Sequence, residues 1–414
     1  MVALAQPRTP SALWTRNFSL YFTARSIALL GDGMLPVAVA LAVGGAGFGP
    51  TGVGLVLAAF MVPFALLILF GGVFADRFTA RKMMIGADLA RVVTQSVVAV
   101  ALFSGDPSLW LLVAMSAIAG AAAAMFQPGV NSMVRRVASD PQRANATLRV
   151  ADAIAQLAGP ALSAILVAAI SAGVVYAVNA ATFAVSAVCL LALRLGAEPV
   201  VARGASMLRN LKEGWCEFRS RAWMWGVISI FSAMAMLTFA PLYPLGSTLV
   251  TDRLGQTAYG WVMSAMGAGT ILGGLIAMRY KPARPLRAGA VALVGFALMP
   301  LGYAVHAPFG GLVALHILGG ASWAFWSVMW STSVQTQVAP EVLNRVTAYE
   351  VAGSVGSIPI GQALAGPMAA LVGAEAVLGF GTAVGLACCL AMLAVPAIRG
   401  LRRVGLGALA GEGS

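Results

Sequence analysis

Twelve long apolar runs, separated by short polar segments, constrain this chain more than any other feature of its sequence. Each run reaches about 20 residues, the length that a helix needs to cross the hydrocarbon core of a bilayer. Only 10% of the residues are charged, far fewer than a soluble protein of this length needs to stay hydrated. We therefore predict an all-α membrane protein with twelve transmembrane helices. The expected spans are Phe18–Val43, Thr51–Phe74, Met83–Phe103, Leu109–Asn131, Thr147–Ile170, Val174–Leu193, Met224–Leu245, Tyr259–Met278, Leu286–Val305, Gly311–Thr332, Thr347–Leu371 and Val377–Pro396.

The cations of the loops gather in alternate connecting segments. If the N-terminus is cytoplasmic, the inner segments hold almost all of these cations, and the outer loops hold Arg253 alone. This asymmetry follows the positive-inside rule and predicts a multi-pass protein of the cytoplasmic membrane with both termini inside. The net charge of +12 is then a consequence of topology. We expect no nucleic-acid partner, because a DNA-binding face needs its cations clustered on a soluble domain.

The widest gap between spans divides the chain into six spans and six. We expect an N-terminal six-helix bundle at residues 1–195, a cytoplasmic linker at 196–222, and a C-terminal six-helix bundle with a short tail at 223–414. Within the linker, Ala205–Arg219 has the apolar spacing of an amphipathic helix on the inner membrane surface. The two halves also repeat at an offset of about 199 residues, as transporters commonly do. The matching pairs are Pro141 with Pro340, Asn145 with Asn344, Pro160 with Pro359, and Phe126 with Phe325.

Residue patterns typical of enzymes and metal sites are missing from the sequence. The four cysteines lie in or beside apolar runs without a CxxC pair, and the two histidines lack metal-ligand spacing. The sequence also lacks HExxH, GxSxG and the phosphate-binding GxxxxGK[ST], and the last absence argues against direct ATP coupling. We expect no enzymatic activity, no metal and no cofactor.

The loop between the second and third spans carries a family resemblance. From Gly71 to Lys82 it reads GGVFADRFTARK, which resembles the signature loop of the major facilitator superfamily. Thr79 stands where that family usually has glycine, and Ala80 stands where it usually has arginine. The matching positions are Gly72, Asp76, Arg77 and Arg81. The resemblance implies two pseudo-symmetric six-helix bundles and a loop whose ion pairs latch the cytoplasmic side. Alternatively, Asp76 only caps the third helix while the cations set the topology.

Three further segments are similar to the twelve-span exporters of the enterobactin-exporter and macrolide-efflux type. They are Asn17–Asp32, the Phe126-Gln-Pro128 and Arg143-Ala-Asn145 segments, and Ala158-Gly159-Pro160. Gly159 and Pro160 stand where such exporters often carry a Gly-Pro motif in their fifth span. The resemblance implies secondary active export of a hydrophobic or amphipathic compound, such as an antibiotic, drug or siderophore, by alternating access. Import or facilitated movement of a small metabolite is the alternative, and an integral-membrane enzyme or a channel is less well supported.

Charged residues inside the spans are the strongest functional indication from the residues themselves. A charge at the bilayer centre costs about 2.5–3.5 kcal/mol on insertion scales, so such residues usually face the bundle interior and have a function. Asp32, near the middle of the first span, is the first candidate for a proton-coupling site, with Asp88 and Asp152 as further candidates. Arg25 lies two helical turns before Asp32 on the same face. The spacings of Asp88 with Arg91, and of Arg149 with Asp152, let each pair meet on one helix face.

Each of these residues also has a structural interpretation. A nearby arginine could hold Asp32 ionised, and the other charged residues could serve gating or packing, as could Glu350 near the inner end of the eleventh span. Three tryptophans of the tenth span, Trp323, Trp326 and Trp330, share a helix face that could stack on a ligand or anchor the helix at the interface. We expect as partners a small-molecule substrate, protons and the lipid bilayer, with the protein acting as a monomer.

Overall fold

The twelve predicted spans are confirmed. The computed structural model describes residues 13–68, 79–138, 140–196, 215–216, 218–338, 350 and 353–402, and these residues contain twelve helices long and apolar enough to cross a membrane. The membrane-spanning segments are Arg16–Gly45, Gly49–Ile68, Ala80–Phe103, Leu109–Gln127, Arg143–Ala169, Ala172–Leu191, Ala222–Leu254, Gln256–Arg279, Pro285–Ala304, Phe309–Gln337, Gly353–Val372 and Ala374–Ala394. The expected amphipathic helix at Ala205–Arg219 lies almost entirely outside the described residues.

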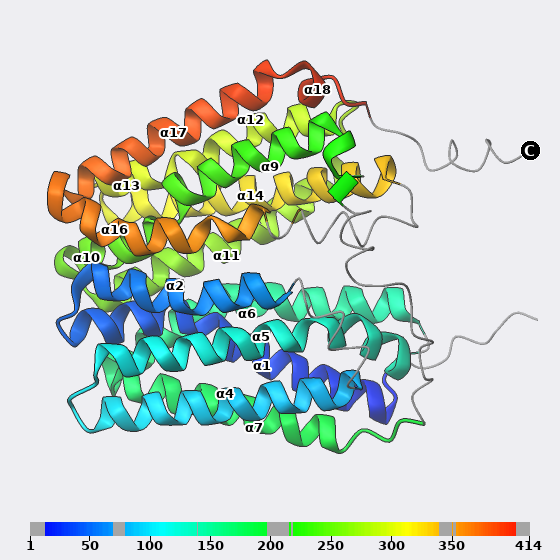
Figure 1. The fold of residues 1–414 in the computed structure, drawn as a ribbon, viewed down its shortest axis with the longest axis vertical. Helices are drawn as coiled ribbons and strands as arrows, with labels where there is room; N and C mark the ends of the chain where they lie inside the picture. The colour runs from blue at the N-terminus through cyan, green and yellow to red at the C-terminus, as the bar shows by residue number, and fades with distance from the viewer. Residues whose placement is uncertain are drawn as a thin grey trace, which may run out of the picture.

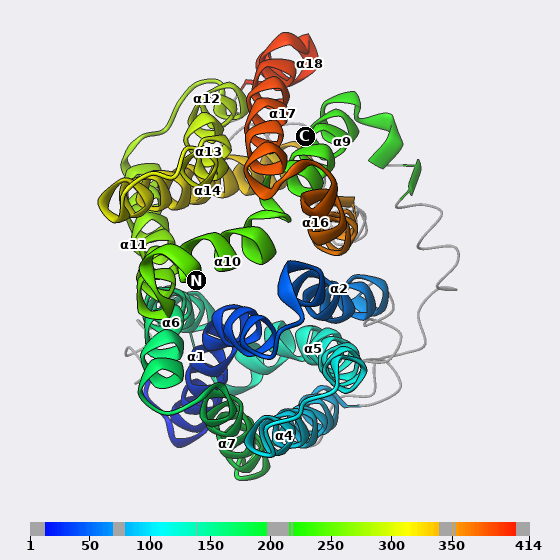
Figure 2. The same cartoon turned by 90° about the vertical axis from the view of Figure 1, so that its left-hand side faces the viewer.

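The helices form two bundles, one from each half of the chain (Figure 1). The N-terminal half contains α1 (Arg16–Gly45), α2 (Gly49–Ile68), α4 (Ala80–Phe103), α5 (Leu109–Val137), α6 (Pro141–Ala169) and α7 (Ala172–Leu191). The C-terminal half contains α9 (Ala222–Met234), the π-helical segment η1 (Ala235–Phe239), α10 (Leu242–Leu254), α11 (Gln256–Arg279), α12 (Pro285–Ala297), α13 (Met299–Ala304), α14 (Phe309–Gln337), α16 (Ile358–Val372), α17 (Ala374–Ala394) and α18 (Pro396–Arg399). Figure 2, a view along the helices, shows the same two groups end-on.

Local sequence signals set the ends of several helices. Thr79 caps α4 by accepting a hydrogen bond from the backbone N–H of Lys82, and Asp140 caps α6 in the same way, with Pro141 in the first turn. Gly255 and Gly373 adopt φ values of +88° and +89° between consecutive helices, a region that favours glycine. These residues make the tight turns that hold neighbouring spans antiparallel.

The seventh span differs from its prediction. The helix continues to Leu254, whereas the sequence predicts an end at Leu245, and the π-helical segment η1 interrupts it. The reason for the difference is composition: the last turns of α10 contain Thr251, Asp252 and Arg253, so the apolar signal ends before the helix does. Hydropathy detects the part of a helix that suits hydrocarbon and misses a polar extension beyond it.

The cations of the described residues are distributed unequally between the two ends of the bundles. One end, called here the basic face, is where α4, α6 and α12 begin; its Lys and Arg residues are Arg16, Arg81, Lys82, Arg136, Arg143, Arg194, Arg219, Arg221, Arg279, Lys281, Arg284, Arg287, Arg399 and Arg402. The connections at the opposite face lie wholly within the described residues. They carry Arg253 as their one Lys or Arg, together with Asp106, Asp252 and Glu375.

Two helix pairs join the halves through small residues. Between α2 and α16, Gly54 lies against the backbone of Gln362, and Gly366 lies against Thr51. Between α6 and α11, Gly260 packs on Ala164. A side chain at these glycines would collide with the partner helix, so the small residues permit the close approach. These contacts lie in the parts of the helices nearest the opposite face.

Two of the four repeated pairs can be placed in the structure, and each pair lies in corresponding spans of the two halves. Phe126 lies in α5 and Phe325 in α14, while Pro160 lies within α6 and Pro359 in the first turn of α16. The other two pairs, Pro141 with Pro340 and Asn145 with Asn344, cannot be compared in this way. Their second members lie outside the described residues. The two pairs that can be placed lie in the spans that the repeat predicts, although Pro160 and Pro359 differ in their distance from the start of the helix.

Candidate functional site

A continuous chain of polar contacts crosses the N-terminal bundle at the level of Asp32. The Arg91 guanidinium of α4 pairs with the Asp32 carboxylate of α1 at 3.5 Å and with the Asp88 carboxylate at 2.6 Å. Ser186 of α7 donates a hydrogen bond to the other oxygen of Asp88, at 2.6 Å. Arg91 and Asp88 are buried, whereas the Asp32 side chain is 38% exposed. The three charged residues and Ser186 therefore link three helices, and Asp32 is the charged residue that reaches accessible space.

Aromatic rings enclose the central arginine of this chain. The Arg91 guanidinium lies over Phe183 of α7 at 4.0 Å and over Phe126 of α5 at 4.9 Å, measured to the ring centroids. Arg25 lies over the Phe126 ring at 5.5 Å, and the structure gives it no ion pair with a described residue. The arginine that pairs with Asp32 is therefore Arg91, and Arg25 contributes through the shared ring.

Glycines on both sides of Asp32 bring neighbouring helices against its backbone. Gly31 faces the side chains of Asn179 and Thr182 on α7, whereas Gly33 faces the backbone of α6. A Cβ added at Gly33 would lie 2.6 Å from the carbonyl oxygen of Ala155, and one added at Gly159 would lie 2.5 Å from the carbonyl carbon of Gly33. Gly159, half of the exporter-like Gly-Pro motif, thus permits the α1–α6 approach beside Asp32.

Replacing Gly159 with alanine should therefore destabilise the protein. The new methyl group would overlap the backbone of Gly33, and overpacking of this kind typically costs about 1–3 kcal/mol. We expect a lower midpoint of thermal unfolding for purified Gly159→Ala in detergent. Gly86→Ala on α4 is the matched control, because a Cβ there meets no other atom within 4 Å. An equal midpoint in both variants would contradict the packing role of Gly159.

A cavity of about 400 Å³ lies between the two halves, and Asp32 is part of its wall. Its N-terminal side is formed mainly by apolar and aromatic residues of α1, α2 and α5, including Phe60 and Phe64. Phe239 and Tyr243 extend into its wall from the C-terminal half, as does Gln362 of α16. This volume falls within the range of small-molecule sites, which are mostly apolar with a few polar groups that fix orientation.

The cavity wall contains polar groups without protein partners. The side-chain carbonyl oxygens of Gln95 on α4 and Gln362 on α16 are buried and accept no hydrogen bond from the described protein. A buried acceptor without a donor costs about 1–3 kcal/mol, so such groups indicate contact with a ligand or water.

A second cavity of about 150 Å³ lies beside the first. Pro36 and Tyr243 line both cavities, and Pro160 is part of the wall of the second. Pro160 of the Gly-Pro motif therefore lines a cavity next to the one that Asp32 lines.

The three tryptophans of the tenth span share one face of α14, and that face meets the interior of the C-terminal bundle. Trp326 and Trp330 are buried, and Trp330 packs against Trp223 of α9 with ring centroids 5.6 Å apart. Trp323 stacks on Phe231 and makes a tilted ring contact with Phe296. The cavity between the halves has none of the three in its wall. Their predicted contact with substrate stays a prediction, and the aromatic residues that do line the cavity are Phe60, Phe64, Tyr176, Phe239 and Tyr243.

The remaining predicted charges have separate places. Arg149 and Asp152 are on α6, but no ion pair within the described residues includes either of them, so their predicted pairing is not formed. The reason is that the spacing permits contact on the helix without requiring it, and Arg149 is exposed. Glu350 accepts a hydrogen bond from the indole N–H of Trp330 and so ties the chain before α16 to α14.

Only the end of the signature loop, from Thr79 to Lys82, lies within the described residues. Gly72, Asp76 and Arg77 lie outside the described residues. Arg81 donates hydrogen bonds to the backbone carbonyls of Leu190 and Leu191 at 2.9 and 2.6 Å. These carbonyls end α7, where a cation also favours the negative end of the helix dipole. Arg81 therefore fastens α4 to α7 within the N-terminal half.

Several residues of this site carry no signal in the sequence. Ser186, Phe183, Gln95 and Gln362 are ordinary members of their spans, and only the packing of distant helices gives them partners or a cavity. The glycines on either side of Asp32 are different. A Gly-Asp-Gly triplet inside an apolar span is visible in the sequence, and a close helix contact beside a charge is its natural explanation.

A membrane protein with two six-span halves and a cavity that both halves line has the architecture of a transporter. The sequence pattern of the Major Facilitator Superfamily matches residues 21–361, which is most of the chain. The chain therefore belongs to this superfamily of transporters, as the signature loop predicted.

Comparisons with individual proteins agree with this assignment. The chain is 22% identical to macrolide efflux protein A of Streptococcus pyogenes over 375 residues, covering 87% of this chain and 91% of that protein. It is 25% identical to the multidrug efflux pump Tap of Mycobacterium tuberculosis (strain ATCC 25618 / H37Rv) over 340 residues, covering 78% and 80%. Among solved structures, the nucleoside transporter NupG superposes with a TM-score of 0.74 at 14% identity, covering 91% of this chain and 98% of that one. The last likeness shows the shared fold.

Proposed function

We propose that this transporter exports small hydrophobic or amphipathic compounds and that inward movement of protons drives the export. The observation that carries the proposal is Asp32, a partly exposed carboxylate in the wall of a mainly apolar and aromatic cavity. An apolar, aromatic wall suits a ligand recognised mainly by its hydrophobic surface. The relatives named for macrolide and multidrug efflux support the same substrate class.

Asp32 and Arg91 suggest how proton and substrate compete. With Asp32 ionised, its carboxylate pairs with Arg91, whereas a proton on Asp32 removes the charge that holds this pair. Asp88 keeps a partner for Arg91 in either case, so protonation does not leave the arginine without a counter-charge. Asp32 therefore serves as the coupling carboxylate, while Asp88 and Ser186 position Arg91. No ion pair among the described residues includes Asp152, and we assign it a secondary role.

We further propose that the protein lies in the cytoplasmic membrane with its basic face inside, according to the positive-inside rule. Two parts of the chain move against each other during transport, residues 1–195 and residues 223–414, and the linker at 196–222 joins them. One chain suffices for transport. The small-residue contacts of α2 with α16 and of α6 with α11 hold the halves together toward the outside. Alternating access then requires these contacts to open when substrate leaves.

A susceptibility and accumulation screen in a pump-deficient bacterial host tests the export proposal. Cells that express the protein should accumulate less of a macrolide and of amphipathic dyes than cells with an empty vector, and should tolerate higher macrolide concentrations. Cells that express Asp32→Asn at the same membrane level should resemble the vector control, because that side chain cannot release a proton. Greater accumulation of every compound in expressing cells would instead establish uptake and overturn the direction of transport.

A further inference from the structure

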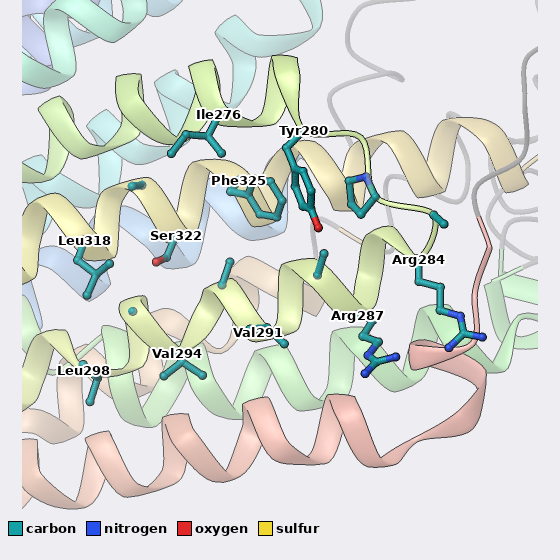
Figure 3. A pocket seen from close by; sticks show the side chains of 16 residues that line it. Ile276, Tyr280, Arg284, Arg287, Val291, Val294, Leu298, Leu318, Ser322 and Phe325 are labelled. Carbon is teal, nitrogen blue, oxygen red and sulfur yellow. The ribbon is translucent and has the colours of Figure 1, made fainter.

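An apolar groove of about 920 Å³ lies within the C-terminal half, and none of its described lining residues belongs to the cavity between the halves. It is formed by α11, α12 and α14, and Figure 3 shows its side chains. Three of the large side chains that line it, Ile276, Val291 and Leu318, are about half exposed, so the groove opens on the outer wall of the bundle. In a membrane protein such a wall faces lipid rather than water.

One end of the groove is positively charged. Arg284 and Arg287, at the start of α12, lie at the end near the basic face, while Leu298 and Leu318 lie at the other end (Figure 3). No hydrogen bond or ion pair within the described part of the chain involves either guanidinium. The Arg81 guanidinium, by contrast, donates hydrogen bonds to two backbone carbonyls. Two guanidinium groups without a described partner, beside the N-terminus of α12, form a favourable binding site for a phosphate.

The groove has the length and polarity of a lipid in one leaflet. Arg287 and Leu298 are eleven residues apart along α12 and its C-terminal end, or about 16 Å of helix. Half of the hydrocarbon core of a bilayer is about 15 Å thick. A headgroup at the arginines would therefore place its acyl chain along the apolar floor of the groove, ending near Leu298 and Leu318.

We propose that this groove is a binding site for an anionic phospholipid of the leaflet on the basic side. Its phosphate pairs with Arg284 and Arg287, and one acyl chain lies between α12 and α14. Tyr280, stacked on Phe325 with ring centroids 6.1 Å apart, closes the groove on the side of α11 at the level of the headgroup. Basic pockets between transmembrane helices are known to select anionic headgroups. The site depends on the bilayer and on the groove, and not on what the central cavity transports.

The corresponding groove of the N-terminal half is a useful comparison. It lies between α4 and α5, has a volume of about 420 Å³, and has Lys82 as the one cation among its described lining residues. A point charge on lysine does not match a phosphate as the planar fork of arginine does. The larger groove with two arginines is therefore the selective one, although the helix pairs are equivalent in the two halves.

Thermal unfolding of the full-length protein in detergent tests this site. Phosphatidylglycerol should raise the unfolding midpoint of the wild type, because a ligand that binds only the folded state stabilises it. Phosphatidylcholine and soluble glycerol 1-phosphate should produce little shift. In Arg284→Gln/Arg287→Gln the shift with phosphatidylglycerol should fall below half of the wild-type shift. Arg399→Gln, another exposed cation of the basic face outside the groove, should keep the full shift.

A second variant separates the groove from general surface charge. Val291→Trp places a large side chain in the apolar part of the groove at an exposed position, so it should reduce the lipid-induced shift while both arginines remain. If the double arginine variant does not fold, Val291→Trp and the single variant Arg287→Gln decide the question. An undiminished shift in the variants, an equal shift with phosphatidylcholine, or an equal shift with glycerol 1-phosphate would each overturn the proposal.

Discussion

Proteoliposomes that contain Asp32→Asn should show no substrate transport driven by a pH gradient, whereas wild-type proteoliposomes transport against the substrate gradient. Asparagine has nearly the same shape as aspartate but cannot bind and release a proton at this site. The neutral side chain still fills its place in the cavity wall, so substrate should still bind and exchange across the membrane without a gradient. The measurement is transport of an amphipathic dye with and without an imposed pH gradient, beside substrate exchange at equal pH.

The control for this experiment is Asp106→Asn. Asp106 is an exposed carboxylate in the connection between α4 and α5 at the opposite face, away from the cavity, and its loss should leave driven transport unchanged. Gradient-driven transport at the wild-type rate in Asp32→Asn would exclude Asp32 as the coupling group. Loss of both driven transport and exchange would instead show that Asp32 is needed for substrate binding.

The number and approximate limits of the spans could be predicted because lipid leaves a chain few choices. A backbone in hydrocarbon must satisfy its own hydrogen bonds, so a long apolar run becomes a helix whatever its neighbours are. The same reasoning failed at the seventh span, where α10 continues through Asp252 and Arg253. Outside the hydrocarbon, local sequence and packing decide where a helix ends, and hydropathy no longer constrains it.

The site could be predicted only where the partners lie on one helix. The pairing of Asp88 with Arg91 follows from a spacing of three residues, and the structure contains it. The pairing of Asp32 with Arg91 joins residues 59 positions apart and depends on how α1 and α4 rotate against each other. The tryptophans of α14 show the same limit: spacing places them on one face, while the packing of α9 and α12 decides what that face meets.

Arg91→Met should destabilise the protein by about 3–5 kcal/mol, the usual cost of removing one partner of a buried ion pair. Methionine fills much of the space of the arginine but leaves Asp88 buried with Ser186 as its remaining described partner. The double variant Asp88→Asn/Arg91→Met removes both charges of the buried pair and should recover part of this loss. Unfolding midpoints and unfolding free energies of the four proteins of this cycle, measured in one detergent, give the coupling energy between the two residues.

The double variant should not regain the full unfolding free energy of the wild type. Transport measurements separate the role of Arg91 in stability from its role as the partner of Asp32. The cation–π contacts with Phe183 and Phe126 are lost in both variants, and a desolvated contact of this kind contributes about 2 kcal/mol. A stable double variant should still lack proton-driven transport, because Asp32 has lost its ion partner as well. If the double variant transports normally, the Asp88–Arg91 pair serves only to hold α4 in the bundle. If Arg91→Met is as stable as the wild type, the buried pair does not hold the bundle together.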